Sequence, residues 1–312
     1  MKLSTSTGDF SCYFDSVSDK VKQYKGLPFK YINLEQTGNI PLLLNGDDYA
    51  VDALADELKE AAEYAGISYV LSHAPCLDAY SELNDEHYWS VINAIKRSMH
   101  ICRSLGIDRI VVHASSNKDF DYKTFYNLNK KFYGDLIPTM EKLNITAMVE
   151  NMHVRPCVEF STGAEMREFL DEMNHPLLGA CWDTAHCNLN PTAREIGQYN
   201  NIIALGKYLK ALHISDNLER GHQHSWPFAG NINFDEVMQG LIDVDYDGYF
   251  NFEASYTLLH EGNSGGKRRE FVHNGHTVTK LRNPPIELKK KAVELLYEVG
   301  KHILNTYDCF EE

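Results

Sequence analysis

The sequence predicts a single (β/α)8 barrel, an α/β fold also called a TIM barrel, with its active site at the C-terminal rim of the strands. Short apolar runs of strand length alternate eight times with longer segments of helical periodicity. The chain has 312 residues, and one such barrel needs about 250. Neither a linker nor a change in composition marks a second domain. Residues 1–312 are therefore expected to form one barrel domain.

The predicted strands are short apolar runs, several of them rich in β-branched and aromatic residues. They cover residues 1–5, 29–35, 67–73, 107–113, 145–150, 177–183, 209–213 and 249–253. The run that ends at Asp183 contains only apolar or small residues before the acid. Such a run suits a strand that is covered on both faces, as in a parallel sheet flanked by helices.

Between the strands, apolar residues recur three and four positions apart, which predicts amphipathic helices. These helices are expected over residues 14–24, 52–65, 87–105, 122–143, 161–173, 196–208, 234–242 and 286–306. Gly26, Gly66 and Gly106 follow the first three helices, and Ser161 and Thr162 suit the capping position of the fifth. The sequence lacks the glycine-rich first turn with which a doubly wound sheet would hold a dinucleotide.

The composition is that of a globular protein with an excess of acids. There are 44 Asp and Glu against 30 Lys and Arg, which gives a formal net charge of −14. This excess opposes binding to nucleic acid or to an anionic membrane. No stretch approaches the roughly 20 consecutive apolar residues of a membrane span. The seven cysteines include no CxxC pair, which favours reduced thiols and a cytoplasmic protein.

Two segments between predicted elements are long, residues 215–233 and 254–283. Loops longer than about 12–15 residues inside a compact domain are usually functional or disordered. Both segments follow predicted strands, so we expect both to lie over the active-site face of the barrel. The second contains the one dense basic run, Lys267-Arg268-Arg269, which we interpret as a solvated loop face.

Six successive predicted strands end in a side chain that can bind a metal or move a proton. In chain order these residues are His73, His113, Glu150, Asp183, His213 and Glu253. The parallel strands of a barrel bring their C-terminal ends to one rim, so the six are expected to converge. Buried carboxylates need compensation, and one divalent cation compensates several of them. The mixed carboxylate and imidazole set therefore predicts a site for an ion such as Zn, Mn, Co or Fe.

The segments around four of these residues resemble the xylose isomerase-like barrel superfamily. They are Met148-Val149-Glu150-Asn151, Trp182-Asp183-Thr184-Ala185-His186, Leu212-His213-Ile214-Ser215-Asp216 and Phe252-Glu253. This superfamily contains sugar isomerases and epimerases, among them the D-tagatose and D-psicose 3-epimerases, and the endonuclease IV-type nucleases. The resemblance implies one divalent metal ion (Mn, Co, Mg or Zn) held by Glu150, Asp183, His213 and Glu253. It also implies that Glu150 and Glu253 are the paired catalytic acid and base.

The resemblance further implies a set of substrate-binding side chains. These are His73, His113, His186, Arg220 and His224. Arg220 is displaced by one position from the arginine of the epimerases. The nucleases hold further zinc ions through comparable histidines. Additional zinc is therefore a second interpretation for His73, His113, His186, His222 and His224.

The favoured function is a sugar, sugar-phosphate or polyol-ketone isomerase or epimerase that moves a proton next to a carbonyl through a metal-stabilised enediolate. A lyase or dehydratase on a sugar-like ketone, including one that cleaves C-glycosides, begins with the same proton removal. This function is therefore an alternative that the sequence leaves open. An endonuclease IV-type zinc phosphodiesterase would need a basic groove, which the net charge of −14 opposes. A non-catalytic module has no need for costly buried charge. The expected partner is a small sugar-like substrate, and homo-oligomer assembly is left open.

Overall fold

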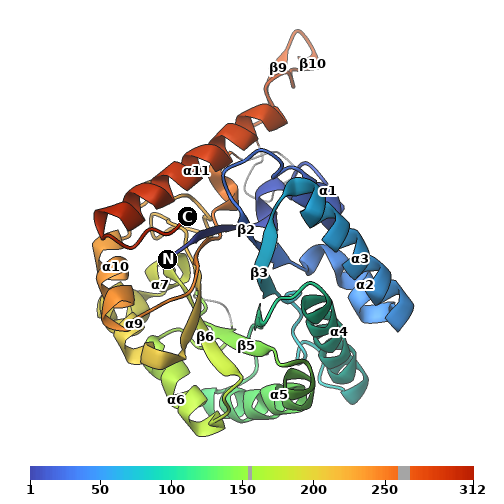
Figure 1. The fold of residues 1–312 in the computed structure, drawn as a ribbon, viewed down its shortest axis with the longest axis vertical. Helices are drawn as coiled ribbons and strands as arrows, with labels where there is room; N and C mark the ends of the chain where they lie inside the picture. Colours follow the sequence, from blue (N-terminus) through green and yellow to red (C-terminus); the bar gives the residue numbers. More distant parts are fainter. Residues whose placement is uncertain (154–156, 259–267) are drawn as a thin grey trace.

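Eight parallel strands surround one axis in the computed structural model, which describes residues 1–153, 157–258 and 268–312 (Figure 1). The strands are β1 (Leu3–Ser6), β2 (Tyr31–Glu35), β3 (Ser68–His73), β4 (Arg109–Val111), β5 (Thr146–Glu150), β6 (Leu178–Asp183), β7 (Leu209–His213) and β8 (Phe250–Phe252). Consecutive strands pair from β1 to β7, and β1 also pairs with β8. A bridge between Ile214 and Phe252 joins the two remaining edges. The predicted (β/α)8 barrel is confirmed.

Helices cover the outside of the barrel. Those that match the predicted helices are α1 (Val17–Lys22), α3 (Asp48–Ala65), α4 (Asp85–Ser104), α5 (Tyr122–Leu143), α6 (Gly163–Met173), α9 (Gln198–Leu205), α10 (Phe234–Asp243) and α11 (Ile286–Thr306). All eight lie where the sequence predicts a helix. Three further helices, α2 (Ile40–Asn45), α7 (Thr184–Leu189) and α8 (Pro191–Ile196), lie in segments without a predicted element.

The segment predicted as one helix over residues 196–208 is broken at both ends. Gly197, with a φ of +87°, separates α8 from α9. After α9, a 3-10 turn over Gly206–Tyr208 leads into β7. Apolar periodicity cannot detect this division because the short helices bury the same face.

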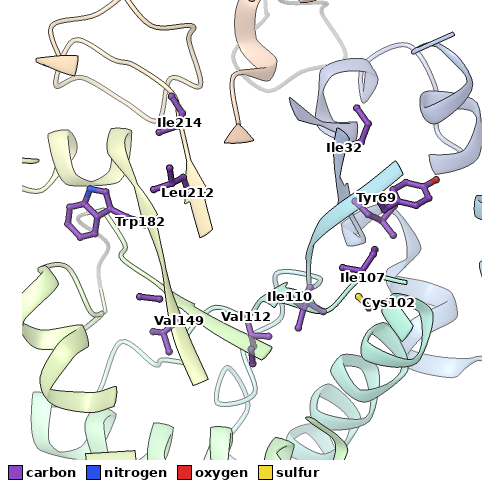
Figure 2. Packing of buried hydrophobic residues seen from close by; sticks show 14 of the residues in the cluster. Ile32, Tyr69, Cys102, Ile107, Ile110, Val112, Val149, Trp182, Leu212 and Ile214 are labelled. Atoms are coloured by element: carbon purple, nitrogen blue, oxygen red, sulfur yellow. The ribbon is translucent and has the colours of Figure 1, made fainter. Parts of the chain in front are cut away.

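Side chains alternate along each strand between the helical layer and the barrel interior. Val149, Trp182 and Leu212 point outward into the core that the strands share with the helices (Figure 2). On the inner face, a separate small apolar cluster fills the barrel. Its members are Leu71, Val111, Met148, Cys181 and Ala211. Two residues after each of these cluster members, the next inward-facing side chain lies at the C-terminal rim. This alternation decides which side chains form the site.

Local capping explains why several helices start and stop where they do. Thr162 caps α6 in a reciprocal capping box with Glu165, which confirms the capping position expected from the sequence. The side chain of Asp47 accepts a hydrogen bond from the Ala50 N–H at the start of α3. Gly66 ends that helix with a φ of +70°, a conformation that glycine adopts without strain.

The long segment after β8 contains a two-stranded hairpin, β9 (Val272–His273) and β10 (His276–Thr277). It projects away from the barrel beside the start of α11 (Figure 1). Lys267, the first residue of the basic run, lies outside the described residues. In the described part of the chain, no helix combines the length and the apolar character that crossing a membrane requires.

Candidate metal centre

The last inward-facing side chain of every strand lies at the C-terminal rim. Around the barrel, these residues are Ser6, Glu35, His73, His113, Glu150, Asp183, His213 and Glu253. Six of them are the residues expected from the sequence. Glu35 was missed, although it ends β2 and pairs in register with His73 on β3. The same strand-end signal that identified the other six would have found it.

Four of these residues come together as one group of potential metal ligands. One ligand atom from each of Glu150, Asp183, His213 and Glu253 lies within 4.8 Å of those of the other three. The Nδ1 atom of His213 is 2.9 Å from Glu150 Oε1 and 2.9 Å from Glu253 Oε2. The first three residues are buried and Glu253 is partly exposed. The structure thus brings together the set that the resemblance implied.

The chemistry of this group fits a divalent cation. Three carboxylates and one imidazole suit a divalent transition metal. Asp183 Oδ2 is buried and has no hydrogen-bond partner among the described residues. A buried carboxylate oxygen without a partner is costly, and an ion at this position would remove the cost.

Burial and mutual repulsion act strongly on the acids of the centre. Burial, followed by the charges of Glu150 and Glu253, raises the pKa of Asp183 well above its usual value. Burial alone would also raise the pKa of Glu150. The neighbouring histidines, with His213 the strongest, outweigh burial and hold the pKa of Glu150 well below its usual value. Carboxylates that stay ionised this close together need positive charge beside them.

Asp183 is oriented by two sets of contacts at the end of β6. Its Oδ1 atom accepts the His186 N–H at 2.7 Å and so caps α7. The Asn151 side chain accepts the Asp183 N–H at 2.6 Å and donates to the Asp183 carbonyl at 2.9 Å. Because the cap occupies Oδ1, only Oδ2 is left for the centre.

Three histidines of the rim have one ring nitrogen fixed by a main-chain carbonyl. Nδ1 of His73 donates to Ala74 at 2.6 Å, and Nδ1 of His186 donates to Asn151 at 2.8 Å. Nδ1 of His224 donates to the carbonyl of Glu253 at 3.0 Å. In a neutral ring, such a contact leaves a lone pair on Nε2 for a hydroxyl or a metal, as it does in His224. The Nε2 of His186 faces His222 instead, and the raised pKa of His73, about 9, keeps that ring protonated near neutral pH.

One pair of histidines adjoins Glu150. His113 Nε2 is 2.9 Å from Glu150 Oε2 and 3.1 Å from His73 Nε2. Burial lowers the pKa of His73, but Glu35 and other neighbours outweigh it and raise the value to about 9. Cys76 lies within ligand distance of both rings. Its position near the two rings was not predictable, because it has no CxxC partner in the sequence.

A second group is a stack of imidazole rings beside Asp183. The rings of His153, His186 and His222 are mutually adjacent, with centroids 4.6 to 5.0 Å apart. Nε2 of His186 is 2.7 Å from Nε2 of His222. Burial, reinforced by the neighbouring histidines, lowers the pKa of His186 to about 3 and that of His222 to about 2. His153 was missed; its position three residues after Glu150 was the available signal.

Two other expected substrate-binding residues differ in position. His224 is buried at the edge of the stack, 4.1 Å between ring centroids from His222. Arg220 is exposed on the loop after β7, and within the described ranges it has neither a hydrogen bond nor an ion pair. The structure therefore places His224 at the centre and gives Arg220 no contact with it.

Comparison with known proteins identifies relatives of this barrel. Residues 21–271 match the family model described as xylose isomerase-like TIM barrel. A ketose 3-epimerase from Arthrobacter globiformis is 24% identical over 164 residues, which cover 51% of this chain and 54% of that protein. A probable endonuclease 4 from Sulfurihydrogenibium sp. is 22% identical over 171 residues, covering 51% and 60%. The chain thus spans little more than half of these two curated relatives.

A solved structure covers almost the whole barrel. D-psicose 3-epimerase from Clostridium cellulolyticum H10 with D-tagatose has a TM-score of 0.73 and 15% sequence identity. The similarity covers 97% of this chain and 99% of that one. At this level of identity, the likeness establishes the shared fold.

Proposed function

The chain belongs to the xylose isomerase-like TIM barrel family, and on that premise we propose that it is a divalent-metal-dependent sugar isomerase or epimerase. The observation that supports this most directly is the four-residue centre of Glu150, Asp183, His213 and Glu253 at the barrel rim. It combines a set of metal ligands with two glutamates that could exchange protons. Similarity to a ketose 3-epimerase agrees with this chemistry.

The centre would hold the ion through Glu150, Asp183, His213 and Glu253. When bound, the ion supplies positive charge beside a sugar carbonyl and its neighbouring hydroxyl, which stabilises negative charge on those oxygens. Proton removal from the carbon that carries this hydroxyl, next to the carbonyl, then becomes easier. Among the side chains, the two glutamates are the proton-transferring candidates.

The two glutamates are not equivalent. The Glu150 side chain is 1% exposed, and its two oxygens lie 2.9 Å from His213 Nδ1 and His113 Nε2. The Glu253 side chain is 21% exposed, and its Oε1 has a looser neighbour, His224 at 3.9 Å. Glu253 is therefore the better placed to take a proton from a substrate, and Glu150 to return one at the opposite face.

The histidines around the centre would bind the substrate. His224 presents an Nε2 whose tautomer is set by a carbonyl on the other side of the ring, and the same kind of contact orients His73 and His186. A neutral Nε2 accepts a hydrogen bond from a sugar hydroxyl. Glu35, held by Ser6 Oγ at 3.0 Å, adds an acceptor on the β2 side.

A zinc phosphodiesterase is the second candidate, favoured by one observation. The two histidine groups, His73 with His113 and His186 with His222, each place ring nitrogens close enough to share a further ion. Similarity to a probable endonuclease 4 agrees with it. The net charge of −14 opposes it, because phosphate contacts dominate binding to nucleic acid.

Deuterium exchange tests the proposal. Metal-loaded protein is incubated with a panel of free and phosphorylated ketoses in D₂O, and exchange at carbon is followed by NMR. We expect deuterium next to the carbonyl of at least one ketose, with formation of its epimer or isomer. An unsaturated or cleaved product would identify a lyase instead. Cleavage of abasic-site DNA without exchange in any ketose would contradict the proposal and support the phosphodiesterase.

Glu253→Gln is the matched variant for this assay. The amide keeps an oxygen that can face the ion but cannot accept the substrate proton, so we expect exchange to fall by about 10²–10⁴-fold. The folded state should persist, as judged by circular dichroism. Exchange at the wild-type rate in this variant would exclude Glu253 as the base.

A further inference from the structure

The hairpin after β8 is a separate surface feature, defined here as the arm, residues 268–283. It leaves the C-terminal rim and projects beyond the barrel before α11 begins (Figure 1). The turn is Asn274-Gly275, with φ values of 49° and 78°. This dipeptide is a strong hairpin signal because both residues tolerate positive φ. Beyond the two strands, the Val278 N–H donates to the Phe271 carbonyl at 2.9 Å.

One face of the arm combines exposed aromatic, apolar and imidazole side chains. Phe271 lies opposite Val278 and His273 opposite His276, so these four side chains share a face. The Phe271 and His273 rings stack with centroids 6.2 Å apart. Phe271 is 60% exposed and Leu281 is 92% exposed. A two-stranded hairpin is marginally stable alone in water, so this face gains most if another surface covers it.

The arm also differs in charge from the rest of the molecule. It carries four basic residues and one acid, a net charge of +3. The chain as a whole carries −14, so the remainder carries −17. Arg269 and Lys280 lie beside Phe271, Val278 and Leu281 around one hollow of the arm. The arm therefore fits a surface that is both apolar and acidic. The rest of this chain carries the negative charge that such a surface needs.

The rim of the barrel offers such a surface, defined here as the acidic rim segment, residues 82–89, which runs from the end of the loop after β3 into the first turn of α4. Leu83 is 70% exposed and Trp89 is 44% exposed. Glu82, Asp85 and Glu86 are exposed on the same segment. The segment follows a strand end, so it lies at the same end of the barrel as the root of the arm.

We propose that the arm docks on the acidic rim segment of a second copy of this chain. The arm and the segment belong to one rim, so a two-fold axis lets each copy insert its arm into the other. The apolar residues Phe271 and Leu281 of one copy then cover Leu83 and Trp89 of the other, while Arg269 and Lys280 face the acids.

A charge exchange between the two surfaces tests this. Sedimentation equilibrium of the full chain at low salt should show a dimer that weakens as salt rises, because exposed charges are screened. R269E/K280E and E82K/E86K should each weaken association at least tenfold. Mixed in equal amounts, they should form a dimer again, because both interfaces of the mixed pair then carry opposite charges.

The control is E60K/E63K, which reverses two exposed acids on α3, away from the rim segment. It should associate like the wild type, and circular dichroism should show all variants folded. A wild type that stays monomeric at low salt, or a dimer unaffected by R269E/K280E, would overturn the proposal. So would a monomer whose arm binds a DNA oligonucleotide in fluorescence anisotropy, which would make nucleic acid the occupant.

Discussion

Asp183 serves two purposes at once. One oxygen caps α7 and the other is buried at the centre without a hydrogen-bond partner among the described residues. A cap alone could be Asn, Ser or Thr with little loss, since all are good N-caps. The carboxylate is therefore explained by the centre and not by the helix, which makes this residue a sensitive probe of metal binding.

We expect Asp183→Asn to keep the fold and lose the metal. The raised pKa of Asp183 means that its contribution to stability is present at low pH and is lost as pH rises through that value. Without metal, the variant should thus unfold at a higher temperature than the wild type, increasingly so at higher pH. Saturating Mn²⁺ should stabilise the wild type by roughly 2.7 kcal/mol at 100 times Kd, and the variant far less. Thermal unfolding with EDTA or Mn²⁺ measures both, and an unchanged metal response in the variant would contradict the assignment.

The His222→Ala variant distinguishes a site that holds one metal ion from a site that holds several. His222 contacts His186 but is not one of the four residues of the centre. If the centre holds one ion, we expect the variant to keep its bound metal and most of its ketose exchange. Joint loss of metal and activity, measured on the same preparation, would show that the histidine stack is itself a metal site.

The strand-end residues were predictable because the C-terminal ends of all strands of a parallel barrel lie at one rim. Residues at the ends of different strands therefore lie close together. Glu150, Asp183 and Glu253 needed only the correct strand ends. His153 and Cys76 were not predictable in this way, since both lie on loops and the loop path decides whether they reach the centre. The unequal exposure of Glu150 and Glu253 also depends on neighbours that only the folded chain brings together.

At the scale of elements, a buried lysine ties α11 to the start of the long segment that follows β8. Lys289 Nζ donates to the Ser255 carbonyl and to Thr257 Oγ1, both at 2.7 Å. Ser255 and Thr257 bound a 3-10 turn that begins two residues after Glu253. Burial lowers the pKa of Lys289, partly offset by the charge of buried Asp9. The helix therefore fixes the start of the long loop beside the catalytic candidate.

The lowered pKa predicts a pH dependence of stability. Just below the usual lysine value of 10.5, the unfolded chain binds more protons at Lys289 than the folded chain does. The free energy of unfolding should then rise with pH, by at most about 1.4 kcal/mol per pH unit for one proton. Lys289→Met should remove this contribution. Urea unfolding of both proteins between pH 8 and 10.5 measures the difference in slope; equal slopes would contradict it.

The elements themselves were largely predictable. Alternating periodicity gave all eight strand–helix units, because each helix must bury one face against the sheet. The arm was missed because its strands are only two residues long, too short for a period-two pattern, although Asn274-Gly275 marked the turn. The break at Gly197 was missed because burial continues through it. His113 lies beyond the end of β4, so the predicted strand was too long there.

For the molecule as a whole, the acid excess has a local and a general consequence. At the rim, acids gather around a place where a cation would compensate them. Over the surface, the negative charge favours contact with the basic arm of a second copy and disfavours nucleic acid. Both consequences point to a small substrate at the rim and not to a polyanion.

The metal content of the purified protein tests the central claim most directly. Elemental analysis should find one divalent ion per chain in the wild type after purification in Mn²⁺ and exhaustive dialysis, and little in Asp183→Asn. No bound ion in the wild type would contradict the metal centre. Two or three zinc ions per chain would contradict the single-ion mechanism and favour the phosphodiesterase.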